Sequence, residues 1–114
     1  MNITFTGHRD RVVNPLDLVK ISQDYPNSLW IQGGATGFDT QVEQVAEALG
    51  IPCKCIPAEW ATYGKAAGPI RNEKMLDLAQ LVVACWDGRT KGGTYQTITS
   101  AKRRGLEIVY LTPL

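Results

Sequence analysis

The strongest constraint on the fold is a regular alternation of β-type and helical segments. Short apolar runs rich in β-branched and aromatic residues lie at residues 2–6, 28–32, 52–56, 81–86 and 107–111. Helical patterns separate them at about residues 15–25, 38–49, 68–79 and 93–104. Strict alternation of this kind predicts a parallel sheet with right-handed crossovers. We therefore expect one α/β domain over residues 1–114, a Rossmann-like three-layer fold around a five-stranded parallel sheet.

Local signals support these assignments. Asn14-Pro15 places a capping residue before a proline at the first helical position. In residues 38–49 the apolar positions recur with the spacing of an amphipathic helix, and Gly50 follows as a stop signal. The run at 81–86, LVVACW, is apolar throughout, which is typical of a strand buried on both faces.

Composition narrows the classes of function. The 114 residues have a net charge of +1, with 12 basic and 11 acidic side chains. This balance argues against nucleic acid as a partner but allows a small basic pocket for one anionic ligand. No apolar run approaches the roughly 18 residues of a membrane span, and the first residues do not have the pattern of a signal peptide. With three cysteines, an odd number, we expect a cytoplasmic protein with reduced thiols and no membrane partner.

Most glycines fall in the loops that follow the expected strands. Ligands bind at the carboxyl ends of strands in such sheets, so these loops form the expected site. Backbone N–H groups at a helix start attract anions, and glycine lets an anion come close. Neither glycine loop is a Walker or a GxGxxG sequence, and each alone could be a plain turn. Together they predict two phosphate-binding loops, formed by Gly33, Gly34 and Gly37 and by Gly92, Gly93 and Thr94.

Charged and aromatic residues cluster in the same loops. Arg71 is placed to bind phosphate oxygens with two donors, or lies on a solvated helix face. Asp39 is either a first-turn acid favoured by the helix dipole or an acceptor for sugar hydroxyls. Trp60 and Tyr63 are candidates for stacking on a base, whereas Trp86 ends a buried run and is expected in the core. The other charged loop residues are His8, Arg9, Asp10, Asp87, Arg89 and Lys91.

Nucleophile and metal chemistry have little support. His8 is the only histidine, and no serine or cysteine has motif support as its nucleophilic partner. Cys53 and Cys55, with one distant histidine, are poorly spaced for zinc, so buried thiols are expected. We expect no metal and no cofactor.

The four loops, TGHRD, GGATGFD, PAEWATYGKAAGPIRN and DGRTKGGT, together resemble the YspA/YpsA-related group of the SLOG superfamily. That superfamily also includes the LOG (lysine-decarboxylase-like) cytokinin-activating enzymes and the DprA Rossmann domain. The resemblance covers nearly the whole chain, and YGKAAGPIRNEKM is its most specific segment. It implies a Rossmann-like fold that binds nucleotides or nucleotide-derived molecules, often as a dimer. Some members look like sensors or carriers of such ligands in conflict and stress systems.

The resemblance also implies a site and raises the question of catalysis. The ligand pocket would be formed by the loop residues Gly7, His8, Arg9, Gly33, Gly34, Gly37, Asp39, Arg71, Asn72, Gly92, Gly93 and Thr94. The LOG enzymes release a base from a nucleoside 5′-monophosphate, and their motif has a catalytic glutamate three residues after Gly-Thr. Here Thr97 stands at that position. Asp39, Glu59 or Glu73 would have to supply a carboxylate from another loop.

Three functions follow from these observations. The leading one is a sensor, carrier or sequestering protein that binds a nucleotide-derived small molecule. The alternative is an enzyme that cleaves an N-glycosidic bond in a nucleotide, with Asp39 or Glu59 as the carboxylate. The third is a nucleic-acid-associated module like that of DprA, against which the near-neutral charge counts. A homodimer or higher homo-oligomer is the expected assembly from the resemblance alone.

Overall fold

The computed structural model describes residues 1–114 and contains one five-stranded sheet, in which every strand is parallel to its neighbours. The order across the sheet is β3-β2-β1-β4-β5. The chain thus moves outward from β1 to β3 and then returns to place β4 on the other side of β1. The expected Rossmann-like α/β fold is confirmed. The strands are β1 (Asn2–Gly7), β2 (Leu29–Gln32), β3 (Cys53–Cys55), β4 (Leu81–Cys85) and β5 (Glu107–Leu111).

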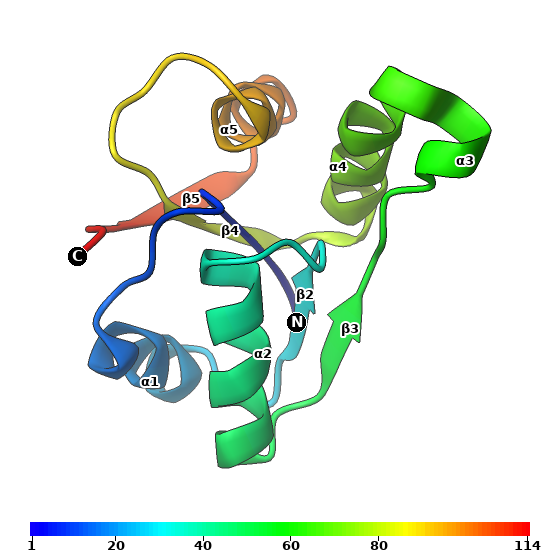
Figure 1. Cartoon of the computed structure of the whole chain (residues 1–114). Helices are drawn as coiled ribbons and strands as arrows, with labels where there is room; N and C mark the ends of the chain where they lie inside the picture. Colours follow the sequence, from blue (N-terminus) through cyan, green and yellow to red (C-terminus); the bar gives the residue numbers. More distant parts are fainter.

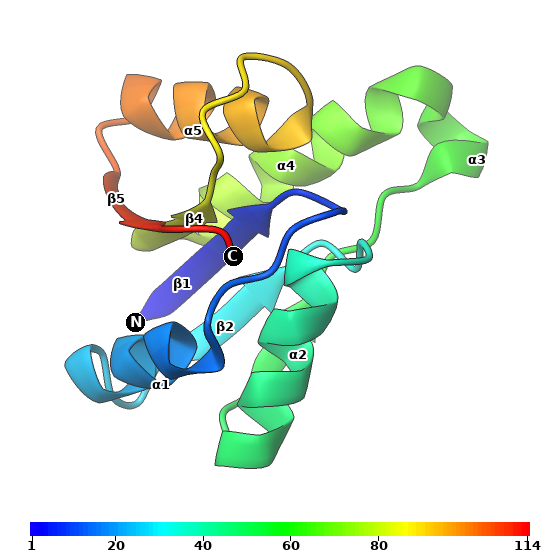
Figure 2. The same cartoon turned by 60° about the vertical axis from the view of Figure 1, so that its left-hand side comes forward.

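Two helices cover each face of the sheet (Figures 1 and 2). The helices α1 (Pro15–Asp24) and α2 (Phe38–Leu49) lie on one face, and α4 (Ala67–Leu78) and α5 (Gly93–Arg103) lie on the other. Right-handed crossovers require this arrangement, because the direction of travel across the sheet reverses after β3. All four helices begin and end within two residues of the expected positions.

One stretch differs from the expectation. The loop expected between β3 and the fourth long helix contains a one-turn helix, α3 (Trp60–Tyr63), and a 3₁₀ helix, η1 (Gly64–Ala66). Every residue from 59 to 66 is exposed. A segment that buries no face has no apolar periodicity, so sequence patterning could not reveal these turns.

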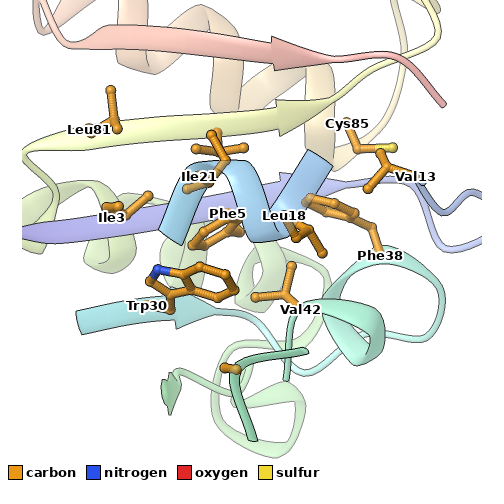
Figure 3. Packing of buried hydrophobic residues seen from close by; sticks show 12 residues of the cluster. Ile3, Phe5, Val13, Leu18, Ile21, Trp30, Phe38, Val42, Leu81 and Cys85 are labelled. Atoms are coloured by element: carbon orange, nitrogen blue, oxygen red, sulfur yellow. The ribbon is translucent and has the colours of Figure 1, made fainter. Parts of the chain in front are cut away.

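The larger core lies between the sheet and α1 and α2 (Figure 3). Phe5 is its centre, with ring centroids 4.7 Å from Trp30 and 6.4 Å from Phe38. A smaller cluster on the other face joins Leu76 of α4 and Ala101 of α5 to the sheet. All five residues of β4 are buried, which confirms a strand covered on both faces.

The predicted helix ends are also present. The Asn14 side chain accepts a hydrogen bond from the backbone N–H of Leu16 at 3.0 Å, with Pro15 as the first residue of α1. Gly50 ends α2 in the left-handed conformation with φ of 69°. These local signals set the lengths of the helices, and the lengths in turn set where each loop reaches the sheet edge.

Candidate ligand-binding site

A cavity of about 740 Å³ lies at the carboxyl ends of β1 and β4. These two strands are adjacent, with Gly7 opposite Cys85 at their ends. The strand order reverses between them, which is where ligands bind in open α/β sheets. The volume lies within the range of small-molecule sites. Of the predicted binding residues, the structure places these around the cavity: Gly7, His8, Arg9, Asp39, Arg71, Asn72, Gly92, Gly93 and Thr94.

The remaining predicted residues lie elsewhere. Gly33 and Gly34 line a second, smaller cavity of about 220 Å³, and Gly37 lines neither. Glu59 lines neither cavity and pairs with Lys74 at 3.4 Å. As a result, Glu59 is not positioned to act on a ligand in either cavity.

The second glycine loop presents free donors to the larger cavity. The first bonded backbone N–H of α5 is that of Gln96, which donates to Gly92 O at 3.2 Å. No side chain caps this end, so the N–H groups of Gly93, Thr94 and Tyr95 have no partner in the helix. Gly92 has φ of 90°, which allows the chain to turn directly into the helix. Gly93 and Thr94 both line the cavity.

The first glycine loop holds a carboxylate of the protein itself. The N–H of Ala35 donates to Asp39 Oδ2 at 3.2 Å, and the N–H of Gly34 donates to Gln32 Oε1. The N–H of Phe38, at the start of α2, donates to the backbone oxygen of His8 at 3.4 Å. Asp39 therefore occupies the place that the sequence suggested for a phosphate.

Two glycines in these loops serve close packing. A Cβ on Gly7 would overlap the side chain of Phe38. A Cβ on Gly37, whose φ is +73°, would overlap the backbone of His8 and Arg9. These contacts hold the loop after β1 against the start of α2, and of the two glycines only Gly7 lines the cavity.

Arg71 is fixed at the wall of the cavity by neutral partners. Its Nη1 donates to Gly33 O, and its Nε donates to Asn72 Oδ1 at 2.9 Å. A Cβ on Gly33 would overlap the guanidinium, which explains glycine at that position. Burial lowers the pKa of Arg71, and Asp39 opposes that effect. Arg71 is therefore not freely solvated on the helix face.

Asp39 is the only one of the three candidate carboxylates that lines the cavity. It is 7% exposed, and burial raises its pKa above the ordinary value of 3.8. The hydrogen bond from Ala35 and the charge of Arg71 oppose that shift. Glu73, the third candidate, pairs with Arg104 at 2.8 Å and lies outside the cavity.

An ionic network joins the loops after β1 and β4. The backbone N–H of Asp87 donates to His8 Nε2 at 3.3 Å, and burial lowers the pKa of His8, so the ring is neutral near pH 7. Arg89 contacts Asp87 at 2.6 Å and Asp10 at 3.3 Å. The Arg89 hydrogen bonds hold the pKa of Asp87 well below its usual range. These contacts fix the loop that leads to the start of α5.

Two cations of the cavity have no acidic partner. Arg89 is neutralised by its carboxylates, whereas Arg9 and Lys91 form no ion pair. Both line the cavity, and Arg71 adds a third positive charge without a carboxylate in contact. The lining is therefore suited to an anion.

The aromatic candidates separate in the structure. Trp60 is 52% exposed and lines both cavities, but Tyr63 lines neither. Trp86 is half-buried and lies outside the cavities, so its expected place in the core is wrong. Its ring stacks on Tyr95 with centroids 6.2 Å apart and lies beside Tyr110 of the edge strand. Because β5 is at the edge of the sheet, no further strand covers the outer side of the Trp86 ring.

Sequence reasoning missed several lining residues, including Gln96 and Met75. Gln96 lies three residues after Gly93 on α5, so helical spacing places both on the same side. Thr97 is fully buried and donates its hydroxyl to Gly93 O at 2.8 Å. The position that holds the catalytic glutamate in LOG enzymes is here directed into the helix and does not line the cavity.

No group of three or more histidine, cysteine or acidic side chains is placed to hold a metal ion. None of the helices combines the length and the apolar character that crossing a membrane requires.

Comparison with known proteins gives the fold. No protein-family model matches the chain, and no curated protein matches it. DNA processing protein A (DprA) from Streptococcus pneumoniae superposes with a TM-score of 0.76 and 16% identity over 96% of this chain. The chain therefore shares its fold with part of DprA. The protein TM1055, a structural genomics target, superposes with a TM-score of 0.70 and 19% identity over 94% of this chain.

The similarity extends over different shares of the two proteins. The chain spans 49% of the DprA chain and 71% of the TM1055 chain. At these identities the superposition shows a shared fold only. It does not transfer the activity of either protein to this chain. The resemblance of the sequence to the SLOG superfamily, which includes the DprA Rossmann domain, is confirmed at the level of the fold.

Proposed function

We propose that this protein binds a nucleotide or nucleotide-derived small molecule in the larger cavity, as a sensor, carrier or sequestering protein. The observation that supports this most directly is the free N–H groups of Gly93 and Thr94, which face a cavity lined by unpaired cations. A phosphate at this position would accept from the helix N-terminus and from Lys91. Trp60, exposed at the wall, offers a surface on which a base can stack.

The place of Asp39 supports a narrower proposal for the phosphate position than the sequence suggested. Asp39 occupies the first glycine loop, and a phosphate beside it would meet a like charge. The second loop has no carboxylate hydrogen-bonded to its N–H groups. We therefore propose that the phosphate binds at Gly92–Thr94 and not in the first glycine loop.

The test is binding to a mixed nucleotide pool. The purified protein is incubated with the pool, washed, and denatured, and the released small molecules are identified by mass spectrometry. We expect an intact nucleotide in stoichiometric amount, and about tenfold weaker binding of it by a Lys91→Ala variant. Retention of no phosphorylated compound by a folded protein would contradict the proposal.

One observation favours the enzymatic alternative. A buried carboxyl with a raised pKa beside a nucleotide is suited to donate a proton to a leaving base during glycosidic cleavage. Asp39 is the candidate, and Glu59 is not, because it lies outside the cavity. Free base counted in the same sample distinguishes the two functions. Base release that disappears in Asp39→Ala would make the protein a hydrolase despite Thr97.

A further inference from the structure

The two cavities of this protein are neighbours with a common wall. The smaller one, of about 220 Å³, shares four lining residues with the larger: Arg9, Ala35, Trp60 and Arg71. Beyond these four its lining has no charged side chain and consists of Gly33, Gly34, Cys55, Pro57 and Ala58. A ligand that fills only the larger cavity would leave this smaller one, with the two shared arginines at its wall, empty beside it.

Arg71 lies at the junction with donors to spare. Its Nη1 and Nε are bonded to Gly33 and Asn72, and its Nη2 makes no hydrogen bond within the protein. Its guanidinium is fixed in place, so its free donors cost little ordering entropy to use. Arg9, also at the junction, has no ion pair either. Asp39 lies near both arginines but forms an ion pair with neither, so two positive charges face one carboxylate. The junction therefore has a net positive charge and is suited to a second anion, separate from the start of α5.

The cations fit a ligand with charge at two points. Lys91 and the free N–H groups of Gly93 and Thr94 line the larger cavity only. Arg9 and Arg71 line both. The first position is formed by the loop after β4 and the start of α5, and the second by Arg9 after β1 and Arg71 of α4. A ligand with two linked phosphates offers one anionic group to each position.

We propose that the ligand is a nucleoside diphosphate ester that occupies both cavities. The nucleoside and the first phosphate lie in the larger cavity, with that phosphate at Gly93 and Lys91. The second phosphate lies between Arg9 and Arg71, and the uncharged group esterified to it enters the smaller cavity. This inference rests on the proposed function and specifies the class of ligand.

The test compares three probes that share one base: a nucleoside monophosphate, the diphosphate, and the diphosphate ester of glucose, measured by isothermal titration calorimetry. The base is the one retained from the mixed pool. We expect the diphosphate to bind about tenfold or more tightly than the monophosphate, as one added charge-assisted hydrogen bond would give. The glucose ester is expected to bind at least as tightly as the diphosphate.

A variant that fills the smaller cavity tests whether the uncharged group esterified to the second phosphate lies there. Ala58 lines only the smaller cavity and is half-buried in the loop between β3 and α3, outside the hydrophobic core, so Ala58→Phe should block the cavity with little effect on folding. We expect about a tenfold or larger loss for the glucose ester, and monophosphate affinity as in the wild type. Cys55→Phe blocks the same cavity from β3 and serves as the second variant. Ala61→Phe, in the adjoining exposed turn α3 but lining neither cavity, is the matched control.

Each outcome separates the inference from the function on which it rests. Equal affinity for the three probes, with binding still weakened in Lys91→Ala, overturns the two-cavity ligand and leaves nucleotide binding intact. Equal losses for all probes in Ala58→Phe, or no loss for any, also overturn it. Failure of every probe to bind the wild type overturns the proposed function itself.

Discussion

Replacing Gly93 by valine tests the position of the proposed phosphate site at little risk to the fold. Gly93 is the first residue of α5, and its φ lies outside the left-handed region. A Cβ there would meet only Asn72 Nδ2, at 3.6 Å, which is an ordinary van der Waals contact. Valine is also a better helix former than glycine, so the free energy of unfolding should change by less than about 1 kcal/mol.

The effect on binding should be much larger. The valine side chain stands over the N–H groups of Gly93 and Thr94 and prevents a phosphate from reaching them. Hydrogen bonds to charged groups contribute about 1.5–3 kcal/mol each. Losing one of them corresponds to about a 10- to 150-fold loss of affinity, and losing both would abolish measurable binding of a micromolar ligand.

The assay is titration calorimetry with the retained nucleotide, with thermal unfolding by circular dichroism on the same samples. Thr99→Val is the matched control, because it places the same side chain at an exposed position of α5 away from the cavity. A melting temperature within about 4 °C of the wild type is expected for both variants. A folded Gly93→Val protein with unchanged affinity would refute the placement of the phosphate.

Three further predictions test other parts of the site. Lys91→Ala should weaken binding of the retained nucleotide by about tenfold and reduce the salt dependence of its affinity. Stability should not change, because Lys91 is exposed and unpaired. An unchanged dependence of affinity on salt in calorimetry would contradict this. Gly7→Ala should destabilise the protein by about 1–3 kcal/mol in urea unfolding, since its methyl group would overlap Phe38. Wild-type stability of this variant would mean that the loop after β1 can shift away from Phe38 at little cost. Asp39→Asn should be more stable than the wild type at pH 7, because burial penalises the ionised carboxyl and raises its pKa. That advantage should shrink as the pH falls through the raised pKa towards 3.8, as the wild-type carboxyl becomes neutral; a stability difference independent of pH would contradict the assignment.

The fold was largely predictable because its determinants are local. The cap at Asn14, the stop at Gly50 and the apolar run of β4 each act over a few residues, and their alternation leaves few topologies. The edge of the sheet on which the site lies was predictable for the same reason, since the loops after parallel strands meet there. The short turn α3 was missed because it buries nothing and so has no pattern.

The interior of the site depends on contacts between distant segments and was less predictable. Nothing local shows that Asp39 turns back to fill the first glycine loop, or that Gly33 is small to admit Arg71, 38 residues further along. The misplacement of Trp86 has a similar origin, because its burial depends on what the edge strand β5 leaves uncovered. Sequence periodicity reports which face a residue occupies, but not how completely that face is covered.

The join between His8 and Asp87 links residues 79 positions apart in the chain. One side of the cavity therefore exists only after β1 and β4 have paired, a step of high contact order that we expect late in folding. No partly folded form that lacks this pairing can bind the ligand, so binding should slow hydrogen exchange most strongly at the amides of β1 and β4. At a ligand concentration one hundred times Kd, the native state would gain about 2.7 kcal/mol over every such form. Ligand binding would then also lower the rate at which the chain is degraded by proteases.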